Sequence, residues 1–394
     1  MQNAYGFSKR TLTMKNIQAI LEKVRHKIIE EEDIRRVVTV LKSGFLSKPE
    51  GGPMVEKFQK QMANMHQQKY AFAVNSGTSA LHCAISALEL KNQEEVIIPA
   101  LSNIADCSTI IQEGGTPVFV DIDENTFNID PQKIEEKITS KTRAIIVVHM
   151  YGQPANMDQL LSISKKHNLT LIEDCAQSAG ARYEGKYVGS FGDITCFSLY
   201  QTKHIICGEG GVVMTRNNQY AKIITSIANN GIIKERLEDY DYDYDRIGYN
   251  YQLSEIQAAL GIGQLKRLDQ NNIERRKNVE KYKHLLSNID IQFQTVSPET
   301  ENSYFYLTAL LPEKLSNKRN EFLSIVTRLG APIKKLYPLS IPEFTLFKDV
   351  VVQDCPIANK ITKRMFNFYV NPGLKDTDIK FIAEVTKEAF QKIS

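Results

Sequence analysis

Residues 193–215 read Asp193-Ile-Thr-Cys-Phe-Ser-Leu-Tyr-Gln-Thr-Lys-His-Ile-Ile-Cys-Gly-Glu-Gly-Gly-Val-Val-Met-Thr215. The pattern predicts an apolar strand from Ile194 to Leu199, a polar turn that holds Lys203, a glycine hinge and a second strand from Val212 to Met214. An ammonium group between two buried strands is costly unless it is paired or used chemically. Lys203 is therefore a candidate catalytic residue, with a solvated loop lysine as the alternative.

The composition is typical of soluble globular proteins and excludes several classes. The 394 residues suffice for two or three domains, with 42% hydrophobic and 24% charged residues. A net charge of +3 without a basic block argues against a nucleic-acid partner. No apolar run is long enough to span a membrane, and the polar N-terminus does not resemble a signal peptide.

The six cysteines are scattered through apolar runs and form no CxxC pair. Such cysteines fit buried free thiols in a reducing cytosol better than disulfides or a zinc site. We therefore expect a cytoplasmic protein without a bound metal.

Between residues 70 and 230, apolar strands alternate with helical patterns, which indicates an α/β fold on a mostly parallel sheet covered on both faces. The predicted strands are Ala71–Val74, Val96–Ile98, Val118–Ile122, Ala144–Val148, Leu169–Ile172, Ile194–Leu199 and Val212–Met214. The predicted helices between them are Thr78–Leu88, Ile104–Glu113, Pro131–Ile138 and Met157–His167.

The flanking segments suggest three parts: an N-terminal arm with helices (1–45), a large domain (46–270) and a small C-terminal α+β domain (271–394). Long helical structure is expected from Leu253 to about Leu286. Past this point, the pattern predicts a strand and three helices, namely Phe305–Leu311, Lys318–Leu329, Ala358–Phe366 and Asp376–Ile393. The Asp/Tyr segment 239–245 reads as an exposed acidic loop, with a substrate-facing lid as the alternative.

Two further motifs follow predicted strands. Asn75-Ser-Gly-Thr-Ser-Ala-Leu81 opens a helix, where backbone N–H groups bind phosphate and Gly77 lets an anion approach. An ordinary serine-capped turn is the alternative. Asp174 ends the strand in Leu171-Ile-Glu-Asp-Cys-Ala-Gln177, so it could hold a protonated pyridine nitrogen, or else cap a helix. Ser198 could reach a phosphate held at Gly77, or bond only to backbone.

These motifs occur together and in order with Gly208-Glu-Gly-Gly211 and Gly248-Tyr-Asn-Tyr251. In that combination the chain resembles the DegT family of pyridoxal-phosphate sugar aminotransferases, a fold type I group, from about residue 27 to the C-terminus. The resemblance implies a large domain with a mostly parallel mixed sheet flanked by helices and a smaller C-terminal α+β domain. It also implies a homodimer with shared active sites.

The same resemblance implies roles for individual residues. Lys203 would bind pyridoxal 5'-phosphate as a Schiff base and then carry protons, while Asp174 would keep the pyridine nitrogen protonated. Gln177 would lie near the phenolic oxygen. The remaining positions would hold the phosphate or lie beside the ring: Gly77, Thr78, Ser79, Ser198, Asn250 from the neighbouring subunit, and Asn103.

The implied activity transfers an amino group from glutamate or glutamine to a keto-sugar, presumed nucleotide-linked, or a related cyclitol, through pyridoxamine 5'-phosphate. Two positions depart from the family pattern, because Asn103 stands where many members stack an aromatic residue and Gln252 where an arginine is common. Two alternatives remain: a sugar dehydratase, which would have histidine in place of Lys203, and a non-catalytic cofactor-binding regulator on the same fold.

Overall fold

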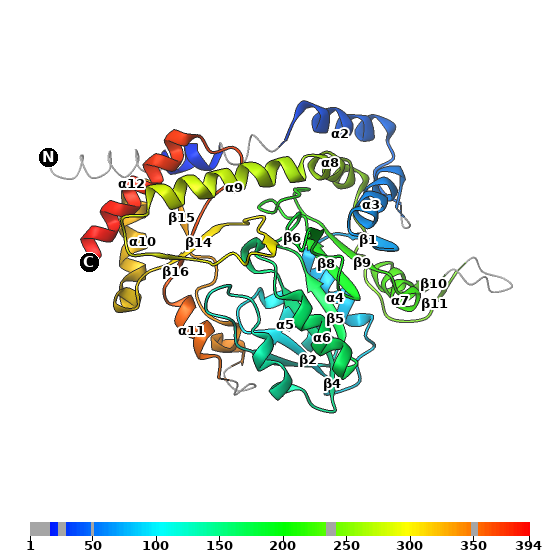
Figure 1. Cartoon of the computed structure of the whole chain (residues 1–394). Coiled ribbons are helices and arrows are strands. Elements are labelled where there is room, and N and C mark those ends of the chain that lie inside the picture. The colour runs from blue at the N-terminus through cyan, green and yellow to red at the C-terminus, as the bar shows by residue number, and fades with distance from the viewer. Residues whose placement is uncertain (1–15, 23–28, 49–50, 234–241, 348–353) are drawn as a thin grey trace.

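The computed structural model describes residues 16–22, 29–48, 51–233, 242–347 and 354–394, and its centre is a seven-stranded mixed sheet (Figure 1). The strand order is β1-β9-β8-β5-β4-β2-β3. Strand β9 runs antiparallel to its neighbours β1 and β8, and the neighbouring strands from β8 to β3 pair in parallel. The strands are β1 (Tyr70–Val74), β2 (Glu95–Pro99), β3 (Thr116–Val120), β4 (Thr142–Val148), β5 (Thr170–Asp174), β8 (Ile194–Ser198) and β9 (Gly211–Thr215). The mostly parallel α/β prediction is confirmed.

Helices cover both faces of this sheet, which explains why its strands are apolar without alternation. Successive residues on β8 illustrate this, because Cys196 packs into one apolar cluster and Phe197 into another on the opposite face. Helices α4 and α5 belong to the first cluster, and α3 and α8 to the second. The covering helices are α3 (Pro53–Met65), α4 (Gly77–Ser86), α5 (Ile104–Gln112), α6 (Met157–His167), α7 (Asn218–Ala228) and α8 (Glu255–Lys266).

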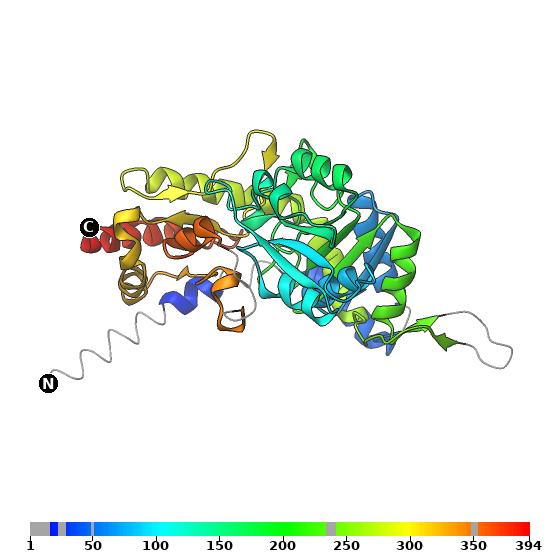
Figure 2. The same ribbon diagram turned by 90° about the horizontal axis from the view of Figure 1, so that it is seen from below.

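The C-terminal part is built on a four-stranded antiparallel sheet with the order β12-β14-β16-β15. Its strands are β12 (Gln292–Phe293), β14 (Leu307–Leu310), β15 (Ile333–Lys334) and β16 (Met365–Phe368). The long helix α9 (Leu268–Leu285) leads out of the large sheet's layer and packs with α10 (Arg319–Arg328) and α12 (Asp376–Ile393) around these strands (Figures 1 and 2). Helix α11 (Pro356–Thr362) precedes β16.

The smaller elements complete the described chain. Helix α2 (Glu31–Ser43) packs on α8, and residues 16–22 are helical. The remaining strands form a three-stranded sheet and a hairpin: β6 (Arg182–Tyr183), β7 (Lys186–Tyr187), β13 (Thr300–Glu301), β10 (Ile232–Ile233) and β11 (Asp243–Tyr244). The 3-10 turns are Pro131–Lys133, Glu135–Lys137, Met150–Gly152, Glu313–Lys318, Ile341–Glu343 and Thr345–Phe347.

Two helix predictions were wrong. The segment Pro131–Ile138 forms two short 3-10 turns, because Ile134 is its one fully buried side chain and too little apolar surface is available to hold a longer helix. The predicted helix Ala358–Phe366 ends at Thr362, and its last residues enter β16, which lies between β14 and β15. Pairing on both edges there overrides the helical pattern.

Expectations for the cysteines, for membrane-spanning helices and for two loop segments can also be compared with the structure. All six cysteines are buried and unpaired, as predicted. None of the described helices combines the length and apolar character needed to cross a lipid bilayer. The predicted N-terminal arm, residues 1–15, and residues 239–241 of the Asp/Tyr loop lie outside the described residues, whereas Asp243–Tyr244 forms β11.

Candidate active site

Lys203 lies in a closed turn that follows β8, the strand beside Asp174. The turn is held by backbone hydrogen bonds from Lys203 N to Tyr200 O (2.9 Å) and from Gln201 N to Gly208 O (3.0 Å). The side chain is half-buried, and its Nζ lies 4.5 Å from the ring centroid of Phe305. Burial lowers the pKa of Lys203 to about 8, the carboxylate of Asp174 opposes this shift and the ammonium of Lys334 adds to it. A larger fraction of this amine is therefore neutral near pH 7 than for an exposed lysine.

Asp174 ends β5 at the carboxyl edge of the sheet, where ligands of open α/β sheets bind. It is 3% exposed, and its Oδ1 accepts a hydrogen bond from Ala176 N at 2.8 Å. Burial raises its pKa, while Lys203 is among the groups that lower it. The Asp174 carboxylate also acts to raise the pKa of Lys203, so the two charges interact.

A phosphate-sized cradle lies at the N-terminus of α4. A Cβ added at Gly77 would lie 2.7 Å from Ser198 Cβ and 3.1 Å from Ser198 Oγ, so the two predicted residues are in direct contact. Ser76 caps the helix by accepting from Ser79 N at 3.0 Å. Among the described residues, the N–H groups of Gly77 and Thr78 have no acceptor in the protein, so they are available to an anion.

Ser79 and Asn103, two of the predicted cofactor ligands, each make a local hydrogen bond in the structure. The Ser79 hydroxyl is buried and donates to Asn75 Oδ1 at 2.6 Å, so Ser79 stabilises the turn from within. Asn103 caps α5, where its Oδ1 accepts from Ala105 N at 2.9 Å. The predicted cofactor contact of each side chain thus competes with a local hydrogen bond.

Asn250 presents its side chain to solvent. Its backbone carbonyl accepts a hydrogen bond from Asn75 Nδ2 at 3.2 Å, beside the cradle. Asn250 also forms an isolated antiparallel β-bridge with Asn229. An exposed amide beside the phosphate cradle is consistent with a contact made across a subunit boundary.

Gln177 is held rigidly between two tyrosines. Its Oε1 accepts from Tyr151 N at 3.2 Å, and its Nε2 donates to Tyr337 Oη at 2.9 Å. Tyr151 adopts a left-handed conformation (φ 57°), a strained backbone of the kind that collects at functional sites. Tyr337 follows β15, so the small sheet contributes a side chain to the site next to Asp174. Sequence reasoning did not assign Tyr337, because it lies 160 residues beyond Gln177.

Glu173 anchors the loop that precedes β8. Its carboxylate accepts from Gly189 N, Phe191 N and Gly192 N at 2.6–2.9 Å, and from His149 Nε2 at 3.1 Å. His149 Nδ1 accepts from Ala155 N, so its proton lies on Nε2. The cluster of His149, Glu173 and Cys175 has the residue types of a metal site, but the hydrogen bonds to Glu173 already give it a structural role.

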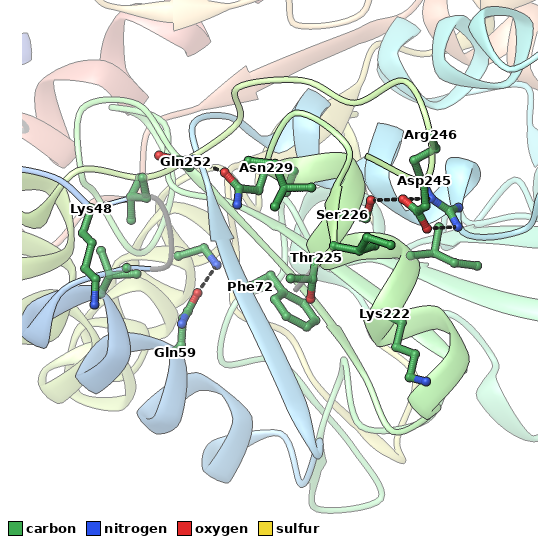
Figure 3. A pocket seen from close by; sticks show the side chains of 18 of the residues that line it. Lys48, Gln59, Phe72, Lys222, Thr225, Ser226, Asn229, Asp245, Arg246 and Gln252 are labelled. Carbon is green, nitrogen blue, oxygen red and sulfur yellow. Dashed lines mark hydrogen bonds and ion pairs between the residues drawn. The ribbon is translucent and has the colours of Figure 1, made fainter. Parts of the chain in front are cut away.

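A cavity of about 890 Å³ lies along β1 and α7 (Figure 3). Phe72, Thr225, Asn229 and Gln252 line it, and Gln252 Nε2 donates to Asn229 Oδ1 at 2.6 Å. None of the predicted catalytic or cofactor residues lines this cavity. Gln252, which stands where an arginine is common in the family, therefore faces the cavity at the edge of the large sheet.

The donor set fits pyridoxal phosphate. Free N–H groups and a serine hydroxyl surround a space at Gly77 that a Cβ would fill, which suits the phosphate. A buried carboxyl group suits the pyridine nitrogen, and a half-buried amine of lowered pKa suits the aldehyde. Lys203, Asp174, Gly77 and Ser198 were all predicted from the sequence. In the structure Gly77 lies against Ser198, and Lys203 interacts electrostatically with Asp174, while their roles toward the cofactor stay predictions.

Comparisons with known proteins agree with this geometry. The chain is 34% identical over 340 residues to the GDP-perosamine synthase of Escherichia coli O157:H7, covering 86% of this chain and 91% of that protein. It is 32% identical over 330 residues to the UDP-N-acetyl-3-dehydro-alpha-D-glucosamine 3-aminotransferase of Acidithiobacillus ferrooxidans, covering 84% and 86%. The putative sugar aminotransferase Spr1654 of Streptococcus pneumoniae, solved in its PMP form, superposes with a TM-score of 0.87 at 26% identity, covering 93% and 98%.

Residues 27–387 match the DegT/DnrJ/EryC1/StrS aminotransferase family, which is most of the chain. The matched range includes Lys203, Asp174 and Gly77, and the large mixed sheet agrees with the family assignment. The chain therefore belongs to the DegT/DnrJ/EryC1/StrS aminotransferase family and is a pyridoxal-phosphate-dependent enzyme.

Proposed function

We propose that this enzyme transfers an amino group from glutamate or glutamine to a nucleotide-linked keto-sugar. The names of the two curated relatives, which contain a GDP-linked and a UDP-linked sugar, support the acceptor class. The proposed donor rests on the family resemblance. The electrostatic interaction between the half-buried Lys203 and the buried Asp174 is the observation that carries the proposal, and the close approach of Gly77 to Ser198 supports it.

Each residue then has a specific task. Bound pyridoxal phosphate supplies the electron sink that stabilises a carbanion. Lys203 would hold the cofactor aldehyde, and its free amine would act as the base that takes up the proton leaving the amino-bearing carbon of the donor. Its pKa of about 8 leaves a useful fraction of neutral base near pH 7. Asp174 holds a proton on the pyridine nitrogen, and Gln177 orients the phenolic oxygen.

The phosphate anchor consists of Gly77 and Thr78 through their N–H groups, and of Ser198 through its hydroxyl. The dipole of α4 adds to this attraction, because phosphate carries negative charge at a helix N-terminus. Ser79 and Asn103 complete the proposed cofactor site, although each of them also supports its own helix.

We further propose that two copies of the chain form a homodimer in which Asn250 reaches the phosphate of the other subunit. Large apolar side chains are exposed near Asn250, with Ile247 at 85%, Tyr244 at 56% and Tyr249 at 39% exposed. The hairpin β10–β11 projects from the body of the large sheet (Figure 2). A second copy would cover this surface, and exposed apolar patches commonly mark interfaces.

We also propose that the chain is divided into two domains. Residues 46–270 form the large domain and 271–394 the small one, since the apolar cluster around the small sheet comes mainly from Val279 to Ile393.

Six unpaired thiols favour a reducing compartment, so we propose that the enzyme is cytoplasmic.

Borohydride reduction tests the proposed role of Lys203. Reduction of the holoenzyme followed by proteolysis and mass spectrometry should place the cofactor label on Lys203. The label should disappear in Lys203→Ala and remain in Lys222→Ala, a lysine that lines the cavity along α7. A label on any other residue would overturn the assignment.

A product assay separates amino transfer from dehydration. The pyridoxamine form should convert a panel of nucleotide-linked keto-sugars into amino sugars with a mass change that corresponds to replacement of oxygen by NH and two hydrogens. A dehydratase would yield a deoxygenated sugar instead. His204 offers little support for that alternative, since its Nε2 contacts Ser303 O at 3.1 Å and burial lowers its pKa well below the ordinary value.

A further inference from the structure

Asp106 is a second buried acid next to the predicted cofactor carboxyl group, and sequence reasoning did not single it out. It lies in the first turn of α5 and is 0% exposed. Its carboxyl group lies within hydrogen-bonding reach of Asp174, which ends β5. The two acids therefore meet at the carboxyl edge of the sheet.

The hydrogen bonds of Asp106 indicate which of its two carboxyl oxygens would carry a proton. Oδ2 accepts the hydroxyl of Ser102, whereas Oδ1 is fully buried and has no donor. A buried carboxylate oxygen without a donor is costly, and two adjacent buried carboxylates repel each other. A proton on Oδ1 of Asp106 removes both costs, because the resulting O–H can donate to Asp174.

We propose that Asp106 is a positioning residue of the cofactor site, which stays neutral and donates a hydrogen bond to the Asp174 carboxylate. Asp174 then keeps a single negative charge whose remaining lone pairs face the pyridine nitrogen. The proposal rests on the proposed role of Asp174, and it adds a specific origin for the fixed position of that carboxylate. Asp106 acts through Asp174 and makes no proposed contact with the substrate.

The electrostatic surroundings agree with this assignment. Burial raises the pKa of Asp106 well above its ordinary value, and Asp174 raises it further. Lys203 is the cation that opposes this shift. The other titratable groups near Asp106 are Tyr337, Cys107 and Cys196, whose pKa values are all raised and which are therefore neutral near pH 7.

The pH dependence of apo-protein unfolding tests the proposal without the cofactor. The native chain keeps a proton on Asp106 that the unfolded chain releases above about pH 4, so folding becomes less favourable as pH rises through this window. Asp106→Asn has the same shape but carries no such proton. We expect the folding constant of the wild type, divided by that of Asp106→Asn, to fall about tenfold per pH unit above about pH 4.5.

Cofactor affinity supplies a second readout. An amide at position 106 can still donate to Asp174, so Asp106→Asn should bind pyridoxal phosphate within about threefold of the wild type. Asp106→Leu cannot donate and should bind at least tenfold more weakly, which corresponds to the loss of about one charge-assisted hydrogen bond. Both dissociation constants come from titration of the apo-protein by absorbance. Should Asp106→Leu not fold, Asp106→Ala is the non-donating variant.

Three outcomes are informative. Parallel pH profiles for the wild type and Asp106→Asn would overturn the proposal, because Asp106 would then hold no extra proton. Equal cofactor affinity in the Asn and Leu variants would also overturn it. Failure of borohydride to label Lys203 would instead overturn the proposed function, and it would leave the apo-protein pH profile unaffected.

Discussion

The contact between Gly77 and Ser198 yields a quantitative prediction about cofactor binding. In Gly77→Ala, the new Cβ would lie 2.7 Å from Ser198 Cβ, a distance that real Cβ atoms do not tolerate, so one of the two segments must move. Neither can move freely, because Ser198 ends β8 inside the sheet and Gly77 begins α4. Overpacking of this kind costs about 1–3 kcal/mol.

That cost should appear in the affinity for the phosphate group. If all of it falls on the bound state, about 1–3 kcal/mol corresponds to a loss of roughly 5- to 150-fold in the dissociation constant of pyridoxal phosphate. Titration of the apo-protein with cofactor, followed by absorbance, measures the loss.

A double-mutant cycle isolates the steric cause. Ser198→Gly removes the atoms at 2.7 and 3.1 Å and leaves the backbone Cα at 3.3 Å, so it should relieve much of the strain in Gly77→Ala. The losses in the double variant should thus be smaller than the sum of the single losses. Wild-type affinity in Gly77→Ala, or strictly additive losses, would refute the cradle.

Four further predictions concern other parts of the site. Mixing subunits of Lys203→Ala and Asn250→Ala should restore up to half of the activity per dimer, because one site in each mixed dimer is intact; no recovery would place Asn250 in its own subunit's site. Lys203 in the apo-protein should react with an amine-directed reagent with a midpoint near pH 8, which peptide mapping can measure, and a midpoint near pH 10.5 would contradict its burial. Tyr337→Phe removes the acceptor for Gln177 Nε2 and should lower kcat/KM about fivefold, the value of one hydrogen bond; unchanged steady-state kinetics would remove Tyr337 from the site. Glu173→Gln should lower the free energy of unfolding at pH 7 by about 3 kcal/mol, because three backbone donors lose a charged acceptor.

The stability difference between the wild type and Glu173→Gln should change with pH in a definite direction. Burial alone raises the pKa of Glu173, but hydrogen bonds from His149 and from the backbone hold it below the ordinary value. A lowered native pKa gives stability that is present above the unfolded pKa of about 4.3 and lost as pH falls through the native pKa. The difference between the wild type and Glu173→Gln in denaturant unfolding should therefore shrink below about pH 4.

The sequence was most informative where local pattern and tertiary environment agree. All seven strands of the large sheet were predicted, because strands covered on both faces are apolar throughout and are separated by polar turns. The four-residue strand β16 was missed, since it directly follows α11 and its pairing with β14 comes from a segment about sixty residues earlier. Short strands of this kind are determined by their partners.

The residues of the candidate site likewise divide into those that a local pattern predicts and those that depend on tertiary packing. Lys203, Asp174 and Gly77 each follow a strand of the large sheet, so the fold brings them to one edge and the sequence could predict them. Asp106 lies within a helix between apolar residues, and its one sequence signal is an acid in the otherwise apolar run Ala105-Asp106-Cys107. Tyr337 depends on how the small sheet docks, which no local pattern records.

The hydrogen bond from Gln177 to Tyr337 joins the two sheets across the site, and Phe305 places its ring against the Lys203 amine from the same side. The surroundings of the Lys203 amine therefore depend on segments from both sheets. A substitution in the small sheet can thus change the proton affinity of a base that the large sheet positions.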